Sequence, residues 1–416
     1  MISKITFKNH PMLGNLSLDF SKSDGKPYKN IVLIGENGSG KTSVLKQISN
    51  HFAGGNITYS QIVSLKRDGT IMETAALSTG FSYTSTQASF SKENDYVDRN
   101  ELFNSDIDTR TYENDISEKE VKNLLVSIVR RDDNDLAKTV HKNGEMTESE
   151  YLAFNKQSRL NRFSSAFNNF FETLSLESID CEVGKVVFKK NGKRFQMVGL
   201  STGEKEIVMR GACILKNLGN MQDGVVLIDE PEIGMHPRWA KKIMKYYDDL
   251  VTVNGDQLAQ VIIATHSEFV LENALADKEN TLVILLKDNN GTIESKKING
   301  PFVLPALTSA EVNYEAFHIV SKGYHNQLYA YLQELAGTSS SVKDTDKKIY
   351  HSTLFDAGKH SKDSKHKNCE YKTLPTYVRN AIDHPDSRNE FTEQELEESI
   401  ELLRKICSAF SNSMQN

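Results

Sequence analysis

The sequence predicts an α/β protein with a mostly parallel sheet, a helical insertion and an all-α domain at its C-terminal end. Three observations predict this class. Strand-like and helix-like segments alternate over residues 1–300, which is typical of a parallel sheet. A polar stretch with helical spacing interrupts the alternation at about residues 90–175. Beyond residue 300 almost no strand signal remains, so we expect a separate helical domain over residues 301–416.

Composition excludes several classes of protein. The 416 residues carry a formal net charge of -6, so any nucleic acid would have to bind a local basic patch. The four cysteines are scattered and form no CxxC pair, which argues against a disulfide framework or a structural zinc site and favours a reducing cytoplasm. The apolar runs are of strand length, well short of the ~18 residues of a membrane helix. We therefore expect a soluble cytoplasmic protein with no membrane partner.

The first half of the sheet is predicted from residues 1–51. Ile5 and Phe7 alternate with polar residues, as in a strand with one buried face. Ile31–Ile34 is a continuous apolar run, as expected for a strand covered on both faces. Glycines end this run, and Lys41–His51 has the pattern of a helix.

The insertion and the second half follow. Glu118–Arg131 carries apolar residues at helical spacing, which indicates a helical lobe; a solvated, partly disordered excursion is the alternative. The later predicted elements are helices at Glu204–Leu218 and Pro237–Val253, and strands at Gly224–Ile228, Gln260–Ala264, Thr281–Leu286 and Ile293–Lys297. In the tail, helices are predicted at Ser309–Leu335, Leu374–His384 and Thr392–Phe410.

A phosphate-binding loop stands between the strand at Ile31–Ile34 and the helix after it. Gly35–Thr42 matches G-x-x-x-x-G-K-[ST], where glycines let backbone N–H groups face the phosphates. Lys41 would reach the β- and γ-phosphates of ATP, and Thr42 would ligate Mg²⁺. The loop residues expected to contact the nucleotide are Gly35, Asn37, Gly38, Ser39, Gly40, Lys41 and Thr42.

Two acids end the apolar run Val225–Ile228. Asp229 is expected to hold the Mg²⁺ shell, and Glu230 to orient and deprotonate the attacking water. An ordinary strand that ends in acids is the alternative, and the phosphate loop upstream weighs against it.

Leu200-Ser201-Thr202-Gly203-Glu204 resembles the signature motif of ABC-type ATPases, with departures at Thr202 and Glu204. The resemblance implies that Ser201 and the N–H of Gly203 contact a γ-phosphate at a helix N-terminus. In that family the signature faces the phosphate loop of another subunit. The resemblance therefore implies a homodimer, or a higher even oligomer, with ATP between two chains.

Two further segments resemble ABC-type motifs. Ala264-Thr265-His266-Ser267 is similar to the switch-histidine segment, which implies that His266 senses the γ-phosphate. Glu230–Pro237 resembles the D-loop at the dimer seam. A glutamine from a loop between the phosphate loop and the lobe would contact Mg²⁺. Gln61 is the candidate, and Gln87 is the alternative.

The order of these motifs over residues 1–300 resembles the compact SMC-like ATPases of bacterial anti-phage and abortive-infection systems. The segments Glu230–Pro237 and Ala264–Ser267 carry that resemblance. No long heptad run is present, which excludes a long coiled-coil arm. ATP and Mg²⁺ are the implied cofactors.

The tail contains Arg379-Asn380-Ala-Ile-Asp383-His384, which resembles the R-x4-6-H motif of HEPN ribonucleases. The resemblance implies that Arg379 and His384 cut RNA while Asn380 shapes the pocket. An arginine can hold the scissile phosphate and a histidine can move protons near neutral pH. The alternative is structural: Arg379 pairs with Asp383 one helical turn away, and His384 caps the helix.

The lysine- and aromatic-rich residues 343–372 suit RNA, or form a solvated loop. The combination resembles anticodon nucleases that join an ABC-type ATPase to a HEPN-class RNase. We therefore expect an anti-phage toxin in which a phage trigger changes the nucleotide state and RNA is cut, with tRNA as the candidate target. One alternative is an ATPase that holds and releases a separately encoded nuclease. A second is an SMC-like DNA-repair ATPase.

Overall fold

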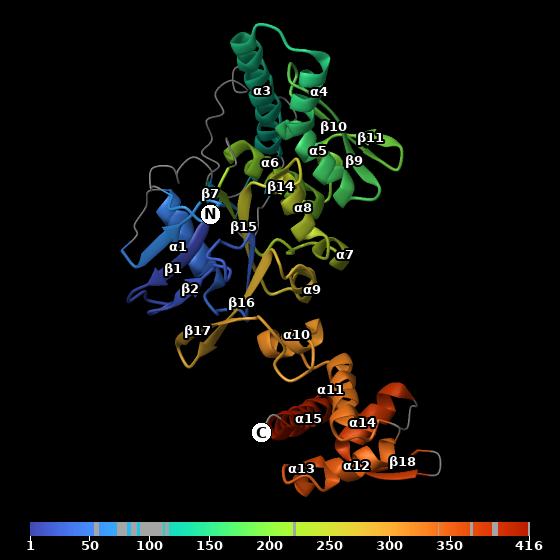
Figure 1. The fold of residues 1–416 in the computed structure, drawn as a ribbon. Helices are drawn as coiled ribbons and strands as arrows, with labels where there is room; N and C mark the ends of the chain where they lie inside the picture. Colours follow the sequence, from blue (N-terminus) through green and yellow to red (C-terminus); the bar gives the residue numbers. More distant parts are fainter. Residues whose placement is uncertain are drawn as a thin grey trace. The chain divides into compact units, whose positions relative to one another are not determined.

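The computed structural model describes residues 1–53, 58–72, 81–84, 90–91, 111–112, 116–218, 222–339, 341–366, 369–384 and 390–414 (Figure 1). Two compact units divide the chain. Unit 1 is Met1–Lys297 and unit 2 is Ile298–Asn416. The fold class predicted from the sequence is confirmed: an α/β unit with a phosphate loop is followed by a mainly helical unit.

A seven-stranded sheet is the centre of unit 1, with the strand order β17-β16-β3-β15-β12-β5-β7. All neighbouring pairs are parallel except β16 with β17. The interior strands β3, β12 and β15 are buried at every residue, which explains their unbroken apolar sequences. The strands are β3 (Asn30–Ile34), β5 (Phe81–Thr84), β7 (Thr111–Tyr112), β12 (Gly224–Asp229), β15 (Ala259–Thr265), β16 (Thr281–Asn289) and β17 (Thr292–Lys297).

The start of the chain forms part of a smaller antiparallel sheet with the strand order β2-β1-β4. Its strands are β1 (Ile2–Phe7), β2 (Ser17–Asp19) and β4 (Ser60–Ser64). The apolar side chains of β1 join the inward face of helix α1 (Lys41–Phe52) and one face of the central sheet in a single core. This core fixes the start of α1, and with it the phosphate loop.

The helical insertion is a lobe with its own small sheet. Helices α3 (Glu118–Asn143), α4 (Glu148–Gln157) and α5 (Arg159–Phe170) precede the antiparallel sheet β11-β10-β9. Figure 1 shows these elements gathered at one end of unit 1. The strands of this small sheet are β9 (Leu174–Asp180), β10 (Lys185–Lys190) and β11 (Lys193–Phe195). A short parallel pair, β6 (Phe90–Ser91) and β8 (Ile116–Ser117), comes before α3 in the chain. Residues 92–110 and 113–115 of the predicted insertion lie outside the described residues, and the described part consists mainly of these helices and strands.

Helix α6 (Thr202–Asn217) follows the lobe and a short 3₁₀ turn, η2 (Met197–Gly199). It packs tightly against α8 (Ile243–Val251). The hydroxyl of Tyr246 on α8 donates a 2.8 Å hydrogen bond to the carbonyl oxygen of Ile207. A Cβ atom at Gly211 would collide with that same hydroxyl, so glycine is required for this approach.

The single helix predicted at Pro237–Val253 is wrong in detail. The structure has α7 (Pro237–Ala240), then α8, then the hairpin β13 (Thr252–Val253) and β14 (Asp256–Gln257). Asn254 and Gly255 both have positive φ, 52° and 87°, which makes the tight turn that ends the helical run. Helix α9 (Glu268–Ala276) follows β15.

Unit 2 contains α10 (Ser309–Phe317), α11 (Lys322–Leu335), α12 (Val342–Tyr350), α13 (Ala357–His360), α14 (Leu374–Asp383) and α15 (Glu393–Met414). His318, at φ 52°, ends α10 and divides the predicted helix Ser309–Leu335 in two. One antiparallel hairpin, β18 (Ser361–His366) with β19 (Cys369–Thr373), was not expected from the sequence. Within the described residues, no helix is both long and apolar enough to cross a bilayer.

Candidate functional site

Three neighbouring strands bring the predicted ATP-site motifs to one edge of the sheet. Strand β15 lies between β3 and β12, and all three are parallel. The phosphate loop follows β3, His266 follows β15, Asp229 ends β12 and Glu230 follows it. Ligands of open parallel sheets bind at the carboxyl ends of the strands, so the topology assembles a candidate site from segments about 190 to 230 residues apart.

Backbone conformation favours glycine at three positions of the phosphate loop, and close packing adds to this at two of them. Gly35, Gly38 and Gly40 have φ of 150°, 85° and 90°. A Cβ atom at Gly35 would collide with the carbonyl oxygen of Leu286 on β16. At Gly40 it would lie 2.6 Å from Cδ2 of Leu13, whereas at Gly38 nothing lies within 4 Å. The loop is thus packed against β16 at Gly35 and against Leu13 at Gly40, and it is open at Gly38.

Lys41 is buried, and its ammonium group turns back onto the loop that precedes it. Its Nζ donates to the carbonyl oxygens of Gly35 and Glu36 at 2.8 and 2.9 Å. Burial lowers the pKa of Lys41, and the nearby carboxylates of Glu230 and Asp229 oppose that shift. An anion at the loop would stabilise this partly desolvated cation.

The candidate water-activating acid and the candidate switch histidine contact each other. His266 Nδ1 lies 3.2 Å from Oε1 of Glu230. Glu230 has φ 43°, an uncommon conformation for a non-glycine residue, and its N–H donates to the carbonyl oxygen of Ala264 at 2.8 Å. Backbone strain of this kind concentrates at functional sites. The Glu230 side chain is 16% exposed and that of His266 43%, so both can meet a ligand.

Sequence reasoning assigned no role to the side chain of Glu232, which in the structure contacts the backbone of His266. Its Oε1 accepts hydrogen bonds from Thr265 Oγ1 at 2.6 Å and from the His266 N–H at 3.3 Å. Burial raises the pKa of this carboxyl group, although these hydrogen bonds act in the opposite direction. Glu232 therefore ties the segment after β12 to the segment after β15. The signal in the sequence was its place two residues after Glu230.

Arg210 on α6 is a second residue that the sequence did not single out. It is fully buried, and Nε and Nη2 both contact Oε1 of Glu206, at 2.9 and 2.8 Å. Nη1 donates to Thr84 Oγ1 at 3.2 Å and to the Asp229 carbonyl oxygen at 3.4 Å. The side chain thus links α6 to the ends of β5 and β12. A buried arginine inside a helix has no periodic signal that separates it from an exposed one.

The signature-like segment forms the N-terminus of α6 and carries a capping box. Glu204 N–H donates to Ser201 Oγ at 3.4 Å, and the Ser201 N–H donates to Glu204 Oε2 at 2.8 Å. Lys190 of the lobe pairs with Glu204 Oε1 at 2.7 Å. Gly203 lies against the Glu230–Pro237 segment, where an added Cβ would be 3.1 Å from the Gly234 carbonyl oxygen. Glu204, a departure from the usual motif, therefore caps its own helix.

The expected metal ligands fit a divalent cation. Asp229 is buried at the strand end, Thr42 is half-buried on α1, and the Asp229 and Glu230 carboxylates raise the pKa of Lys41 against the effect of burial. Buried Ser39 Oγ has no hydrogen-bond partner among the described residues, so a polar atom of the loop is left for a ligand. Asn37 is exposed in the loop.

Gln61 does not lie in a loop. It is an exposed residue within β4, opposite Thr6 of β1, because Ser60–Ser64 alternates as a strand. The expected contact with Mg²⁺ stays a prediction without a loop to support it. Gln87, the alternative, lies outside the described residues, three positions after the end of β5.

In unit 2, Arg379 and His384 lie at the end of one helix, α14. Arg379 Nη2 pairs with Asp383 Oδ2 at 2.8 Å, and its Nη1 donates to Asn380 Oδ1 at 2.9 Å. His384 is the exposed C-cap residue, with its N–H bonded to the Asn380 carbonyl oxygen. These are the contacts that the structural alternative predicts. Whether the pair also cuts RNA stays a prediction.

Comparison with protein families gives one match. Residues 80–272 match the family model described as "AAA domain, putative AbiEii toxin, Type IV TA system". The matched segment begins after the phosphate loop and contains the lobe, the signature-like segment, Asp229, Glu230 and His266. No curated protein matches the chain.

The solved structures that match this chain include three head domains of SMC proteins. An SMC head bound to the C-winged helix domain of ScpA has 14% identity and a TM-score of 0.42, over 71% of this chain and 97% of that one. The SMC head domain from Thermotoga maritima has 13% identity and a TM-score of 0.39, over 71% and 98%. An SMC head domain with an extended coiled coil, bound to the C-terminal domain of ScpA from Pyrococcus furiosus, has 13% identity and a TM-score of 0.38, over 76% of this chain and 99% of that one. The family match and the motif geometry support an ABC-type ATPase.

Proposed function

We propose that the chain is an ATPase that closes ATP between two copies of itself. One copy would supply the phosphate loop with Asp229, Glu230 and His266, and the other would supply Ser201 and Gly203 from the start of α6. The 3.2 Å contact between Glu230 and His266, at strand ends beside the phosphate loop, carries this proposal.

The arrangement suits hydrolysis. Lys41 and the N–H groups of the loop would bind the β- and γ-phosphates, and Asp229 and Thr42 would hold Mg²⁺, which neutralises phosphate charge when bound. Glu230 would accept a proton from the attacking water. His266, whose backbone N–H donates to Glu232, would donate a hydrogen bond to the γ-phosphate. Its contact with Glu230 would couple the presence of this phosphate to the position of the Glu230 carboxylate.

A complementation experiment tests the shared site. Chains with Lys41→Ala or Ser201→Arg are purified separately, and phosphate release from ATP is measured alone and after mixing. Each variant alone should be inactive. A mixture should recover up to roughly a quarter of the wild-type rate, because half of random dimers are mixed and each of these holds one intact site.

Two outcomes would contradict the proposal. If both variants keep full activity as monomers, the signature is not part of the site. If the mixture stays inactive although mass photometry shows mixed dimers, the phosphate loop and the signature of one chain act together. A variant with Lys142→Ala, an exposed residue at the end of α3, serves as the matched control and should keep the wild-type rate.

A second proposal concerns unit 2 and the biological role. We propose that the nucleotide state controls RNA cleavage by Arg379 and His384 in an anti-phage or growth-arrest response. The exposed position of His384, next in sequence to the Arg379 partner Asp383, favours it, as does the matched family's description as a putative toxin. Basic and aromatic side chains also meet in this unit: Lys362 lies 4.2 Å from the ring centroid of Tyr377, and Lys372 lies 5.3 Å from that of Tyr350.

Incubation of total RNA with the protein and ATP tests this second proposal. Wild type should produce discrete fragments, and His384→Ala should lose them while its ATPase rate is unchanged. His318→Ala is the matched control, because His318 is an exposed histidine of the same unit paired with Glu397. Unchanged cleavage in His384→Ala contradicts the proposal. So does an inactive wild type that co-purifies with a separate nuclease, the result expected of a holding and releasing scaffold.

A further inference from the structure

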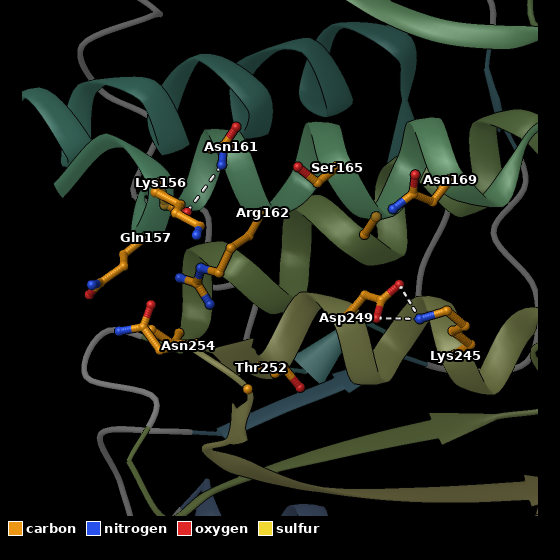
Figure 2. A pocket seen from close by; sticks show the side chains of 13 residues that line it. Lys156, Gln157, Asn161, Arg162, Ser165, Asn169, Lys245, Asp249, Thr252 and Asn254 are labelled. Atoms are coloured by element: carbon orange, nitrogen blue, oxygen red, sulfur yellow. Dashed lines mark hydrogen bonds and ion pairs between the residues drawn. The ribbon is translucent and has the colours of Figure 1, made fainter. Parts of the chain in front are cut away.

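A polar pocket of about 440 Å³ lies between α5 of the lobe and α8 of the core (Figure 2). None of its lining residues belongs to the phosphate loop, the signature-like segment, the Asp229–Glu230 pair or the Ala264–Ser267 segment. Its walls come from the last two residues of α4, Lys156 and Gln157, from one face of α5, from α8, and from β13 with the β13–β14 turn. The volume is in the range of pockets that hold small molecules.

The charges of the pocket favour an anion. Lys156, Arg162 and Lys245 line it against one carboxylate, that of Asp249. Lys245 Nζ pairs with both Asp249 oxygens, at 2.8 and 3.0 Å. Three cations and one carboxylate leave an excess of two positive charges, in a chain whose net charge is -6. The local field is therefore opposite in sign to that of the whole protein.

Arg162 is the fixed part of this field. Its Nη1 donates to the Leu250 carbonyl oxygen at 2.9 Å, which holds the guanidinium group between the two helices, as Figure 2 shows. Burial lowers the pKa of Arg162 to about 10, with a further contribution from Arg159, while Asp132 opposes the shift. Asp132 and Asp135 bind Arg159 directly, at 2.9 and 2.8 Å. A second anion would therefore stabilise a cation that its surroundings disfavour.

The remaining walls suit a polar body rather than a bare ion. Carboxamides at Asn161, Asn169 and Asn254 offer donors and acceptors, and Ser165 and Thr252 add hydroxyls. Figure 2 shows Lys156, Arg162 and Asn254 toward one end and Asn169 with the Lys245–Asp249 pair toward the other. An elongated ligand with one charged end matches this distribution.

We propose that the pocket binds a phosphorylated small molecule of about nucleotide size, with its phosphate at Lys156 and Arg162 and its polar body toward Asn169. A nucleotide and a sugar phosphate share this chemistry. Because α8 also packs on α6, a ligand that bridges α5 and α8 would fix the lobe relative to the signature-like helix. That effect on ATP hydrolysis rests on the proposed function, whereas binding itself does not.

Calorimetry on the full chain with Lys41→Ala tests binding without the phosphate-loop site. The probes are AMP, UMP and glucose 6-phosphate, their parents adenosine, uridine and glucose, and inorganic phosphate. At least one phosphorylated probe should bind at micromolar concentration and at least about tenfold more tightly than its parent, because charge-assisted hydrogen bonds to phosphate are lost. Inorganic phosphate should bind more weakly than that probe.

Two substitutions then locate the site. Lys156→Ala with Lys245→Ala should weaken binding about tenfold or more, and Ser165→Trp, at an exposed position, should abolish it by filling the space. Lys138→Ala with Lys142→Ala on α3 removes the same charge elsewhere on the lobe and should change nothing. The proposal is overturned if no phosphorylated probe binds at about 1 mM. Equal loss in both lysine pairs, or equal affinity for inorganic phosphate, overturns it as well.

Discussion

The ATP site of unit 1 and the Arg379–His384 segment of unit 2 rest on short motifs of similar length, yet the structure treats them differently. In unit 1, residues from β3, β12 and β15 meet at one sheet edge, and Glu230 contacts His266 across 36 positions of sequence. In unit 2, Arg379 contacts Asn380 and Asp383 of its own helix. A motif assembled from distant segments needs a fold to explain it, whereas one confined to a helical turn is also explained by local pairing.

The largest expected effect comes from the acid at the end of β12. Glu230→Gln should lower phosphate release about 10²- to 10⁴-fold, because the amide cannot accept a proton from water. ATP binding, measured by fluorescence of a labelled analogue, should be kept. Asp383→Asn in unit 2 serves as the control and should leave hydrolysis unchanged. A Glu230→Gln chain that hydrolyses ATP normally would remove the contrast between the two regions.

The phosphate loop offers a matched pair of glycines. Gly35→Ala should lower the free energy of unfolding by about 1–3 kcal/mol and abolish ATP binding, since the new methyl group meets the Leu286 carbonyl oxygen. Gly38→Ala meets only the backbone penalty of its positive φ, so its loss should be smaller. Thermal unfolding of both variants measures the difference. Equal losses would show that packing against β16 does not hold the loop.

The half-buried Asp248 on α8 gives a pH test. Burial raises the pKa of Asp248 to about 7, although the Asn30 side chain donates to it at 3.2 Å. The folded state therefore keeps a proton that the unfolded state loses near pH 4, and stability should fall as pH rises from about 4 to 7. Asp248→Asn should remove this slope and raise the melting temperature at pH 8 by a few degrees. If the stability of the Asp248→Asn variant falls with pH as steeply as that of the wild type, the raised pKa of Asp248 is not the cause.

The smallest effect tests the local pair of unit 2. Asp383→Asn removes the Arg379 ion pair and should cost only about 0.3–0.5 kcal/mol, because both side chains are partly exposed and one helical turn apart. Chemical unfolding of unit 2 measures this loss. If Arg379 also binds RNA, the substitution should increase RNA cleavage, because Arg379 is then released from its ion pair with Asp383. Decreased cleavage would mean that the ion pair positions Arg379 for the reaction.

The difference between the regions also sets how much the sequence could predict. The strand at Ile31–Ile34 and its glycine loop were predicted because full burial and tight turns each leave a distinct residue pattern. Glu232 and Arg210 were missed because their roles depend on neighbours from other strands and helices. The β18–β19 hairpin was missed because Ser361–His366 contains no apolar residue to mark an alternation. Gln61 was expected in a loop because Ser60–Ser64 was not recognised as a strand.

The contact between Gly211 and Tyr246 limits how the molecule can respond to nucleotide. No side chain fits at position 211, and the tyrosine hydroxyl is also fastened to the helix backbone at Ile207. A shift of α6 relative to α8 at this point would therefore break the hydrogen bond between Tyr246 and Ile207. Any rearrangement that keeps this hydrogen bond would move the two helices together.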